Sequence, residues 1–494
     1  MKVIVLEHPR IPSETHFNDI ANTPLWSCLM AGYAVSSLRA SGADVSLLDA
    51  CGKKWTFFET AQILLKEAPD LLCVHTVYFW EHTEALFDFF KALRCLGFSG
   101  HITLFGFFPT LAWSAILEVA SAIDSIAVGE CEASLSELAN RLKAGDAWRE
   151  TPGVAFCRNG AARLSARRAP ADNPDVFPDP EHILVPGETA SILASRGCYN
   201  HCRFCPVPTF YMNGPGWRGR SPAAVAAEIS RLKAKGVKDF YFVDPNFIGP
   251  GRKGKERVLE LCRLIAPLHI TFGMETRADD LEEELLSHLK SAGLTSLLIG
   301  IESGSPEILS CLNKGASIRK SEAAISLCRS AGIEPEIGFL MFVPDSTLSG
   351  LEENFSFLKR NHLLDRLDRT ANLLSHRQIV FMGTSGYQLF KNEGRLTKTG
   401  FLGFQAVIEY RDHRVLGISE VVSAACLHVL RETGRPESPL YWEKHDDWTR
   451  ARGVNDVLVS LFESLLMEAN ASSFLSGETG RRRLEAIDKA IAGV

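Results

Sequence analysis

Three cysteines, Cys198, Cys202 and Cys205, are the residues of this sequence whose type and spacing point most directly to chemistry. Their spacing is C-x3-C-x2-C, and they follow an apolar run and Gly197 that predict the end of a strand. Thiolates are the standard protein ligands of iron–sulfur clusters. Three thiolates on one short loop can bind three irons of a [4Fe–4S] cubane. The fourth iron then has no protein ligand and can chelate a small molecule.

A zinc site and an incidental group of buried cysteines are the two alternatives. Zinc normally takes four ligands from paired sequence elements. His201 lies inside the loop, but the sequence has no second ligand pair at a matching distance. Unrelated cysteines rarely fall at this spacing directly after a strand and a glycine. We therefore interpret the loop as an iron–sulfur cluster site.

The segment 195–206, which contains this loop, resembles the signature of the radical S-adenosylmethionine (SAM) superfamily. The resemblance implies that the open iron holds the amino and carboxylate groups of SAM. It also implies that an electron from the cluster cleaves the sulfonium and gives a 5′-deoxyadenosyl radical. Phe204, just before the third cysteine, matches the aromatic residue that the family usually places beside the cluster.

Polar residues follow the later predicted strands at their carboxyl ends, where (β/α) barrels carry their chemistry. The resemblance implies that Glu302 contacts the ribose or amino group of SAM and that Arg277 contacts the carboxylate or a neighbouring acid. Asp279 and Asp280 precede a predicted helix and fit helix capping better than chemistry. Asp244 and Asn246 take the place of the family's second-strand acidic motif, so the SAM-binding residues we expect are Phe204, Asp244, Asn246, Glu275, Arg277, Glu302 and Ser303.

Residues 1–145 alternate short apolar runs with amphipathic segments, which predicts a doubly wound, Rossmann-like α/β domain. The expected strands are Val3–Leu6, Val45–Leu48, Leu71–His75, Ile102–Phe105 and Ile126–Val128, and the expected helices are Leu25–Arg39, Phe57–Lys66, Glu81–Leu93 and Leu111–Ser121. Ligands of such sheets bind beyond the carboxyl ends of the strands. The residues there are Thr76, Val77, Tyr78, Gly106, Phe107, Gly129, Glu130 and Cys131.

The rest of the chain divides into three parts. Residues 146–189 are rich in proline and predict an extended linker. Residues 190–382 predict a partial (β/α)6 barrel, with strands at Ser191–Ser195, Phe240–Val243, Ile270–Gly273, Ser296–Ile301 and Ile337–Val343 and a sixth at Ala371–Ser375 or Gln378–Phe381. Residues 383–494 predict a mostly helical region.

A doubly wound domain directly before such a barrel resembles the cobalamin-binding subclass of the radical SAM superfamily. This resemblance covers residues 1 to about 385 and implies cobalamin as a further cofactor. The Asp-x-His-x-x-Gly motif of one type of cobalamin domain is absent, and the Gly-Gly usual after the fourth strand is here Gly106-Phe107. A sheet that serves only as a scaffold is the alternative. His75 and His101 fit structural roles better than ligand roles.

The resemblance implies a cobalamin-dependent methyltransferase that acts on an unactivated carbon, or less often phosphorus. A second hypothesis is oxidative ring closure or rearrangement with the same cofactors. Methylthiolation of RNA or protein fits poorly, because the six N-terminal cysteines are scattered rather than grouped as a second cluster site. The remaining alternative is a cluster or corrinoid carrier without catalysis.

Composition limits the location and partners of the protein. The net charge of −6 gives no basic stripe for nucleic acid. No apolar run reaches the roughly 18 residues that span a bilayer, and the N-terminus lacks a signal-peptide pattern. We therefore expect a cytoplasmic protein whose thirteen cysteines form no disulfides. Its expected partners are a small, natural-product-like substrate and a reductant such as flavodoxin or ferredoxin.

Overall fold

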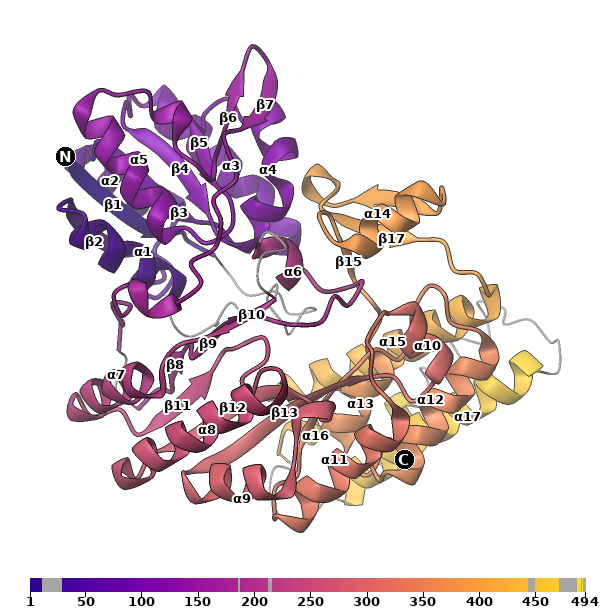
Figure 1. The fold of residues 1–494 in the computed structure, drawn as a ribbon. Coiled ribbons are helices and arrows are strands. Elements are labelled where there is room, and N and C mark those ends of the chain that lie inside the picture. The colour runs from indigo at the N-terminus through magenta and orange to yellow at the C-terminus, as the bar shows by residue number, and fades with distance from the viewer. Residues whose placement is uncertain are drawn as a thin grey trace.

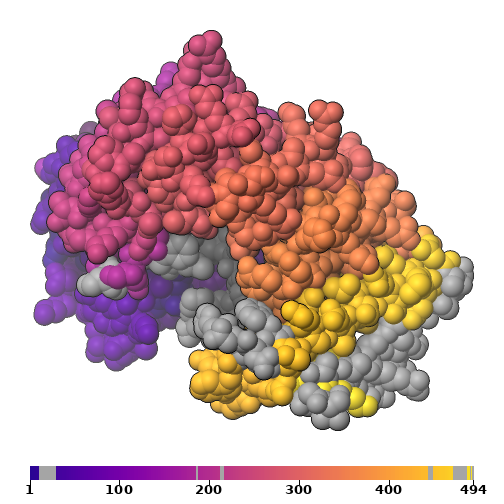
Figure 2. All heavy atoms as spheres, turned by 90° about the horizontal axis from the view of Figure 1, so that it is seen from below, coloured from indigo at the N-terminus to yellow at the C-terminus, as the bar shows by residue number. Residues whose placement is uncertain are grey.

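The structure is a computed structural model of the 494-residue chain, and it describes residues 1–10, 29–184, 187–211, 216–442, 449–470, 487–489 and 491. Figure 1 shows two α/β units, the N-terminal one in indigo and purple and the following one in pink, with the helical C-terminal part in orange and yellow beyond the second. Most of the C-terminal helices lie beyond the second unit, with the last of them in yellow in the view from below (Figure 2), whereas Phe381 and Phe404 share a core with the N-terminal domain.

The N-terminal sheet has the order β2-β1-β3-β4-β5-β6-β7, and its first five strands are parallel. Strand β3 is buried at every position, as expected for a parallel sheet covered by helices on both faces. All five predicted strands are confirmed within two residues. The strands are β1 Lys2–Glu7, β2 Asp44–Asp49, β3 Leu71–His75, β4 His101–Phe105 and β5 Ser125–Ala127.

Five helices accompany this sheet. Helix α2 begins with a capping box, in which the Thr56 side chain accepts from the backbone of Glu59 and the Glu59 carboxylate accepts from the backbone of Thr56. Helix α4 begins at Phe107, four residues before the predicted start, because the chain turns directly at Gly106. The helices are α1 Leu29–Ala40, α2 Phe57–Glu67, α3 Thr83–Cys95, α4 Phe107–Val119 and α5 Glu132–Ala144, and the first residues of the predicted first helix lie outside the described ones.

Part of the segment expected as an extended linker belongs to the N-terminal sheet. Strands β6 Val154–Arg158 and β7 Ala161–Leu164 form a hairpin that pairs antiparallel with β5. The prediction of an extended linker was therefore wrong for residues 154–164. β6 forms hydrogen bonds with the open edge of β5, and β7 pairs with β6. Residues 165–184 carry only a short 3-10 turn at Pro174–Val176 and otherwise run without helix or strand.

The second unit is a five-stranded parallel sheet with the order β14-β13-β12-β11-β8 and helices on its outer face. Its strands bury Phe and Ile side chains against these helices in one continuous core. The strands are β8 Ala190–Ile192, β11 Asp239–Phe242, β12 Thr271–Arg277, β13 Leu294–Glu302 and β14 Glu336–Phe339, and the helices are α7 Pro222–Ala234, α8 Gly251–Ile265, α9 Glu283–Ser291, α10 Pro306–Cys311, α11 Ile318–Ser330 and α12 Leu348–Arg360.

Neither segment predicted for the sixth strand joins this sheet as a strand. Residues 371–375 lie in helix α13 Leu367–Ser375. Residues Val380–Phe381 form β15, which pairs antiparallel with β17 Gln405–Ile408 in a separate three-stranded sheet with β16 Leu396–Thr399. Beyond β14, the barrel continues only as one isolated parallel β-bridge, between Phe342 and Arg377, among the described residues. The barrel is therefore shorter by one strand than the sequence predicted.

The C-terminal region is mostly helical, as predicted, apart from this small sheet. Helix α14 Ser385–Asn392 accompanies the sheet, and α15 His413–Gly434, α16 Pro439–Trp442 and α17 Thr449–Asn470 follow. One helix in the described part of the chain, α15, is long and apolar enough to cross a membrane, although the sequence suggested none. Its buried side chains belong to the core cluster of the barrel, and it packs against α13 and α17.

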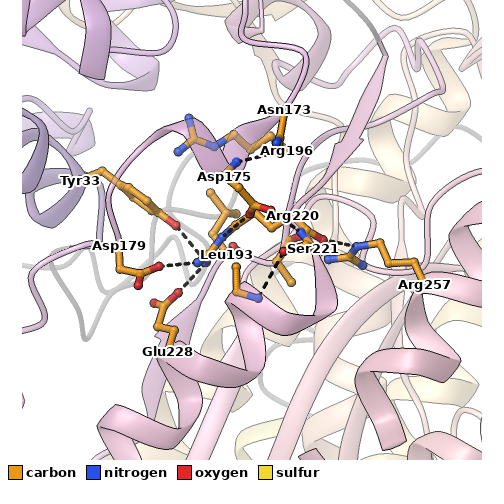
Figure 3. Close-up of polar contacts among 12 residues, drawn as sticks. Tyr33, Asn173, Asp175, Asp179, Leu193, Arg196, Arg220, Ser221, Glu228 and Arg257 are labelled. Carbon is orange, nitrogen blue, oxygen red and sulfur yellow. Dashed lines mark hydrogen bonds and ion pairs between the residues drawn. The ribbon is translucent and has the colours of Figure 1, made fainter. Parts of the chain in front are cut away.

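A buried polar network joins the linker to both α/β units (Figure 3). Its centre is Arg220, which is 4% exposed and donates to Glu228 of α7 at 2.5 Å and to Asp179 of the linker at 2.6 Å. The same guanidinium lies 3.4 Å from the hydroxyl of Tyr33 on α1. Because buried charges need partners, this network holds the linker against the barrel.

We expect the substitution Arg220→Met to destabilise the protein by about 3–5 kcal/mol, because it removes the buried arginine of this network and leaves Glu228 with His182 as its remaining partner. Urea unfolding followed by circular dichroism measures this change. Arg252→Met is the matched control, since the Arg252 side chain is 90% exposed and pairs only with Glu256 one turn along its helix. Equal stability losses in the two variants would contradict the assignment.

Candidate functional site

The cysteine loop begins at β9 Ser195–Gly197, which pairs antiparallel with β10 Trp217–Gly219. Gly197 has φ +79°, and a Cβ there would lie 2.5 Å from the carbonyl oxygen of Gly216. Only glycine permits this turn. Cys202 is buried, and Cys198 and Cys205 are partly exposed. The turn at Gly197 thus directs the three cysteines into one loop beyond the end of the strand.

The three thiols are unpaired and lie within electrostatic reach of one another. Burial raises the pKa of the Cys205 thiol, and the negative charges of Cys202 and Cys198 raise this pKa further. No group of three His, Cys, Asp or Glu side chains among the described residues is placed to hold a single metal ion. A cubane spreads its thiolate ligands over separate irons. The free thiols and their common loop therefore fit a three-cysteine cluster.

Residues 311–315 are attached to the cysteine loop by hydrogen bonds. The Asn200 side-chain amide donates to the Cys202 sulfur at 3.0 Å and to the Lys314 carbonyl at 2.7 Å. The Asn313 amide donates to the His201 carbonyl at 2.8 Å, and the Arg203 backbone donates to Leu312 at 2.9 Å. These bonds place Lys314 directly beside the cysteines.

Lys314 forms a buried ion pair with Glu302, with 2.9 Å between Nζ and Oε1 and side-chain exposures of 7% and 12%. Glu302 ends β13 with φ +70°, an uncommon backbone conformation for a residue with a side chain. Arg277 donates to the Lys314 carbonyl and to Asp279, each at 2.9 Å, and its guanidinium lies 5.4 Å from the Tyr199 ring. Glu302 and Arg277 were predicted from the sequence as SAM-binding residues, whereas Lys314 was not.

Asp280 joins the cysteine loop to the end of β11. The hydroxyl of Tyr199 donates to the Asp280 carboxylate at 2.9 Å, and the amide of Asn246 donates to it at 3.0 Å. No side-chain hydrogen bond caps the following helix, whose N-cap residue is Glu282. The capping role predicted for Asp280 is therefore wrong. Its buried carboxylate is satisfied by two long-range partners that the sequence alone does not reveal.

Comparison with known proteins agrees with this geometry. The family model described as the radical SAM superfamily matches residues 192–358, which span the barrel from β8 to α12. These residues form a radical SAM domain. An uncharacterized methyltransferase of Pyrococcus horikoshii is 26% identical to this chain over 374 residues, which are 73% of this chain and 79% of the relative.

Other curated relatives are covered by this chain over a smaller share of their length, and the solved structures show the fold alone. An anaerobic magnesium-protoporphyrin IX monomethyl ester cyclase of Cereibacter sphaeroides is 28% identical over 71% of this chain and 59% of the relative. The cobalamin-dependent SAM radical enzyme OxsB has a TM-score of 0.71 at 16% identity, covering 99% of this chain and 84% of that chain. The methyltransferase TsrM of Kitasatospora setae has a TM-score of 0.69 at 17% identity, covering 100% and 99%.

The radical SAM barrel holds two buried carboxyls with raised pKa values. Burial raises the pKa of Asp244 to about 6, although its carboxylate accepts from the Ala194 backbone at 3.0 Å. Burial also raises the pKa of Glu275 to about 7, and the charges of Asp244 and Glu302 act in the same direction. The hydroxyl of Tyr241 lies 3.4 Å from Glu275. The structure therefore brings Asp244, Glu275 and Glu302 into one acidic group beside the cysteine loop.

Two predicted SAM-binding residues have clear packing roles. The Ser303 hydroxyl is buried and donates to the Asn354 side chain on α12 at 2.6 Å, which holds the turn after β13. Phe204 is partly buried and packs against an apolar group formed by Ile308, Leu312 and Val343. Phe204 thus supports the cysteine loop from the side of α10.

The carboxyl ends of the N-terminal strands meet the barrel at a cavity. Glu130, after β5, pairs with Arg196 of β9 at 2.7 Å and with Arg218 of β10 at 3.0 Å. Glu132 pairs with Arg196 at 2.6 Å. The cavity is lined by Leu29, Met30, Tyr33, Phe107, Glu130, Cys131, Glu132, Leu193, Arg196, Phe210, Tyr211, Val243 and Pro245. Three of the predicted cobalamin-binding residues therefore share a cavity with the strand that leads into the cysteine loop.

The other predicted cobalamin-binding residues do not line this cavity. Tyr78 packs against Phe404 of the small C-terminal sheet, with 4.7 Å between the ring centroids. Gly129 donates its backbone N–H to Thr110 at 3.0 Å. The remaining residues, Thr76, Val77 and Gly106, are buried around the ends of β3 and β4, where a Cβ on Gly106 would lie 2.9 Å from the His75 ring.

We expect alanine substitution of Cys198, Cys202 or Cys205 to abolish cluster loading, because each thiolate would hold one iron of the cubane. Iron and sulfide content after anaerobic reconstitution measures this loss. Cys95→Ala is the matched control, since Cys95 is exposed on α3 and far along the chain from the loop. Full iron loading in any of the three loop variants would contradict the assignment.

Glu275 should make the stability of the protein depend on pH. Its pKa in the folded state is about 7, above the usual 4.5 of a glutamate, so the folded state binds the proton more tightly than the unfolded state. Stability should therefore fall as pH rises from about 4.5 to about 7. The melting temperature should therefore fall over this pH range. Glu275→Gln should make this fall smaller, whereas the control Glu256→Gln, at an exposed position, should leave it unchanged. An unaltered pH profile in Glu275→Gln would contradict the assignment.

Proposed function

We propose that the protein is a cobalamin-dependent radical SAM methyltransferase that acts on an unactivated carbon centre, or less often on phosphorus. The observation that carries the proposal is the meeting of two strand-end faces. The carboxyl ends of the N-terminal strands share a cavity with β9, which continues into the cysteine loop. Two cofactors bound at these faces would lie next to each other with little water between them, as group transfer through a radical requires.

The described residues fit both cofactors. The cysteine loop offers three free thiols for a cluster, and Glu302, Lys314 and Arg277 offer charged groups for the amino acid part of SAM. The cavity offers apolar and aromatic walls and a buried arginine to one part of a large amphipathic cofactor. When bound, the cluster would supply the electron that cleaves SAM, and cobalamin would supply the methyl group that is transferred.

The chain's own side chains bind, orient and exclude water. Lys314 would offer a cation for the carboxylate of SAM, and Glu302 would offer an acceptor for its amino group or ribose. Asp280 holds Tyr199 and Asn246 together and so keeps the cysteine loop against β11. Phe107 stacks on Phe210, with 3.9 Å between centroids, and both rings line the cavity. The reacting groups would therefore meet in an environment poor in water.

The names of several relatives support methyl transfer over other radical reactions. Besides the relative from Pyrococcus horikoshii, they include a bacteriochlorophyllide d C-8(2)-methyltransferase of Chlorobaculum tepidum and a hopanoid C-3 methylase of Methylococcus capsulatus, each 26% identical. Their names give a bacteriochlorophyllide and a hopanoid as the molecules they methylate. The substrate of the present protein is in our proposal a small, natural-product-like molecule.

Incubation with SAM, cobalamin and dithionite without oxygen should yield both 5′-deoxyadenosine and S-adenosylhomocysteine. The first product reports radical cleavage, and the second reports transfer of the SAM methyl group. Liquid chromatography with mass spectrometry measures both. Cys202→Ala should lose 5′-deoxyadenosine while it still binds cobalamin, because Cys202 lies outside the cavity lining. Formation of 5′-deoxyadenosine without S-adenosylhomocysteine by the unsubstituted protein would argue against methyl transfer.

Oxidative ring closure is the second candidate, and the cyclase relatives favour it. Three such cyclases, of different organisms, match between 67% and 71% of this chain at 25–28% identity. A cyclase would use the same cofactors without adding a carbon to its product. A product heavier than its substrate by one CH2 unit, from a methyl group in place of a hydrogen, decides for the methyltransferase.

We further propose a cytoplasmic location and an external one-electron donor of the flavodoxin or ferredoxin class. The cysteine loop supports the need for such a donor, since cleavage of SAM consumes an electron from the cluster. The net charge of −6 offers no general attraction for nucleic acid.

A further inference from the structure

Lys314 is a buried lysine near the cysteines. Its side chain is 7% exposed, and its ammonium pairs with Glu302 at 2.9 Å. Its backbone carbonyl accepts from Asn200, whose amide also donates to the Cys202 sulfur. Lys314 therefore lies beside Cys202 and is held there by the same amide that contacts the sulfur.

Arg277 is a second buried cation beside the cysteines. It donates to the Lys314 carbonyl at 2.9 Å, and its guanidinium lies 5.4 Å from the ring of Tyr199, which follows Cys198 in the loop. Two buried cations, each with an acidic partner, therefore lie against the cysteine loop.

We propose that Lys314 sets the reduction potential of the cluster held by Cys198, Cys202 and Cys205. One-electron reduction by a flavodoxin- or ferredoxin-class donor adds one negative charge to the cluster and moves no proton. A cation in a buried, weakly screened position favours the more negative state. Net charge and solvent exposure are among the factors that set the potentials of iron–sulfur clusters. Lys314 therefore makes the reduced state easier to reach.

This inference rests on the proposed cluster but not on methyl transfer. It is tested without SAM, cobalamin or substrate, on reconstituted full-length protein whose iron and sulfide content is measured first. A potentiometric titration followed by electron paramagnetic resonance gives the midpoint potential. If Lys314 does not set the potential, the unsubstituted protein still forms 5′-deoxyadenosine. If the proposed function is wrong, the SAM-derived products of the unsubstituted protein are absent or different.

Lys314→Met should shift the midpoint potential to more negative values, whereas Lys314→Arg should stay near the unsubstituted protein. Glu302→Gln should shift it to more positive values, because it removes the opposing charge and keeps the ammonium. Lys320→Met is the control. Lys320 lies on α11, shortly after Lys314 in the chain, and its side chain is 63% exposed.

A fully loaded Lys314→Met protein with the potential of the Lys320→Met control would overturn the proposal. If Lys314→Met does not load the cluster, Glu302→Gln decides the question. A positive shift in Glu302→Gln then supports the electrostatic role, and an unchanged or negative shift overturns it.

Discussion

The rest of this structure depends on a buried contact between oppositely charged residues of two sheets. Glu130 and Glu132 follow the last parallel strand of the N-terminal sheet, and both pair with Arg196 on the short strand that leads into the cysteines. Separation of these charges would leave each one buried without a partner, which is costly. The two strand-end faces are therefore held opposite each other, and the cavity between them follows from that constraint.

The same principle operates around the linker. Arg220 draws together a helix of the barrel, an acid of the linker and a tyrosine of the N-terminal domain. The Arg196 guanidinium lies 4.9 Å from the ring of the same tyrosine, Tyr33. Two arginines, each with partners from different parts of the chain, thus fix the orientation of the N-terminal domain. Apolar packing alone is less directional than such hydrogen-bonded charge pairs.

The sequence was most informative where a residue's role depends on its neighbours in the chain. Buried parallel strands are continuous apolar runs, so β3 and β4 were predicted almost to the residue. The spacing of the three cysteines likewise needs only a few residues to be recognised. Lys314 and Asp280 were missed because their partners, Glu302 and Tyr199, are brought to them by the barrel. A lysine in a polar segment and an acid before a helix look ordinary until the fold is known.

The hairpin at residues 154–164 was missed for a related reason. Its strands are four or five residues long and gain their order from β5, which no local pattern shows. The small sheet β15–β17 is similar, since a strand of two residues carries almost no alternation. The sixth barrel strand was overpredicted, because the apolar residues at 371–374 serve the buried face of α13 instead.

The hairpin also changes how the N-terminal sheet ends. Without it, β5 would present a row of unpaired backbone groups, to which strands of other molecules can add. Antiparallel pairing moves this edge outward to β7, a strand of four residues with the exposed side chain of Arg163. Short edge strands with charged side chains resist edge-to-edge aggregation. A segment that looks like a connector in the sequence therefore protects the folded protein against unwanted self-association.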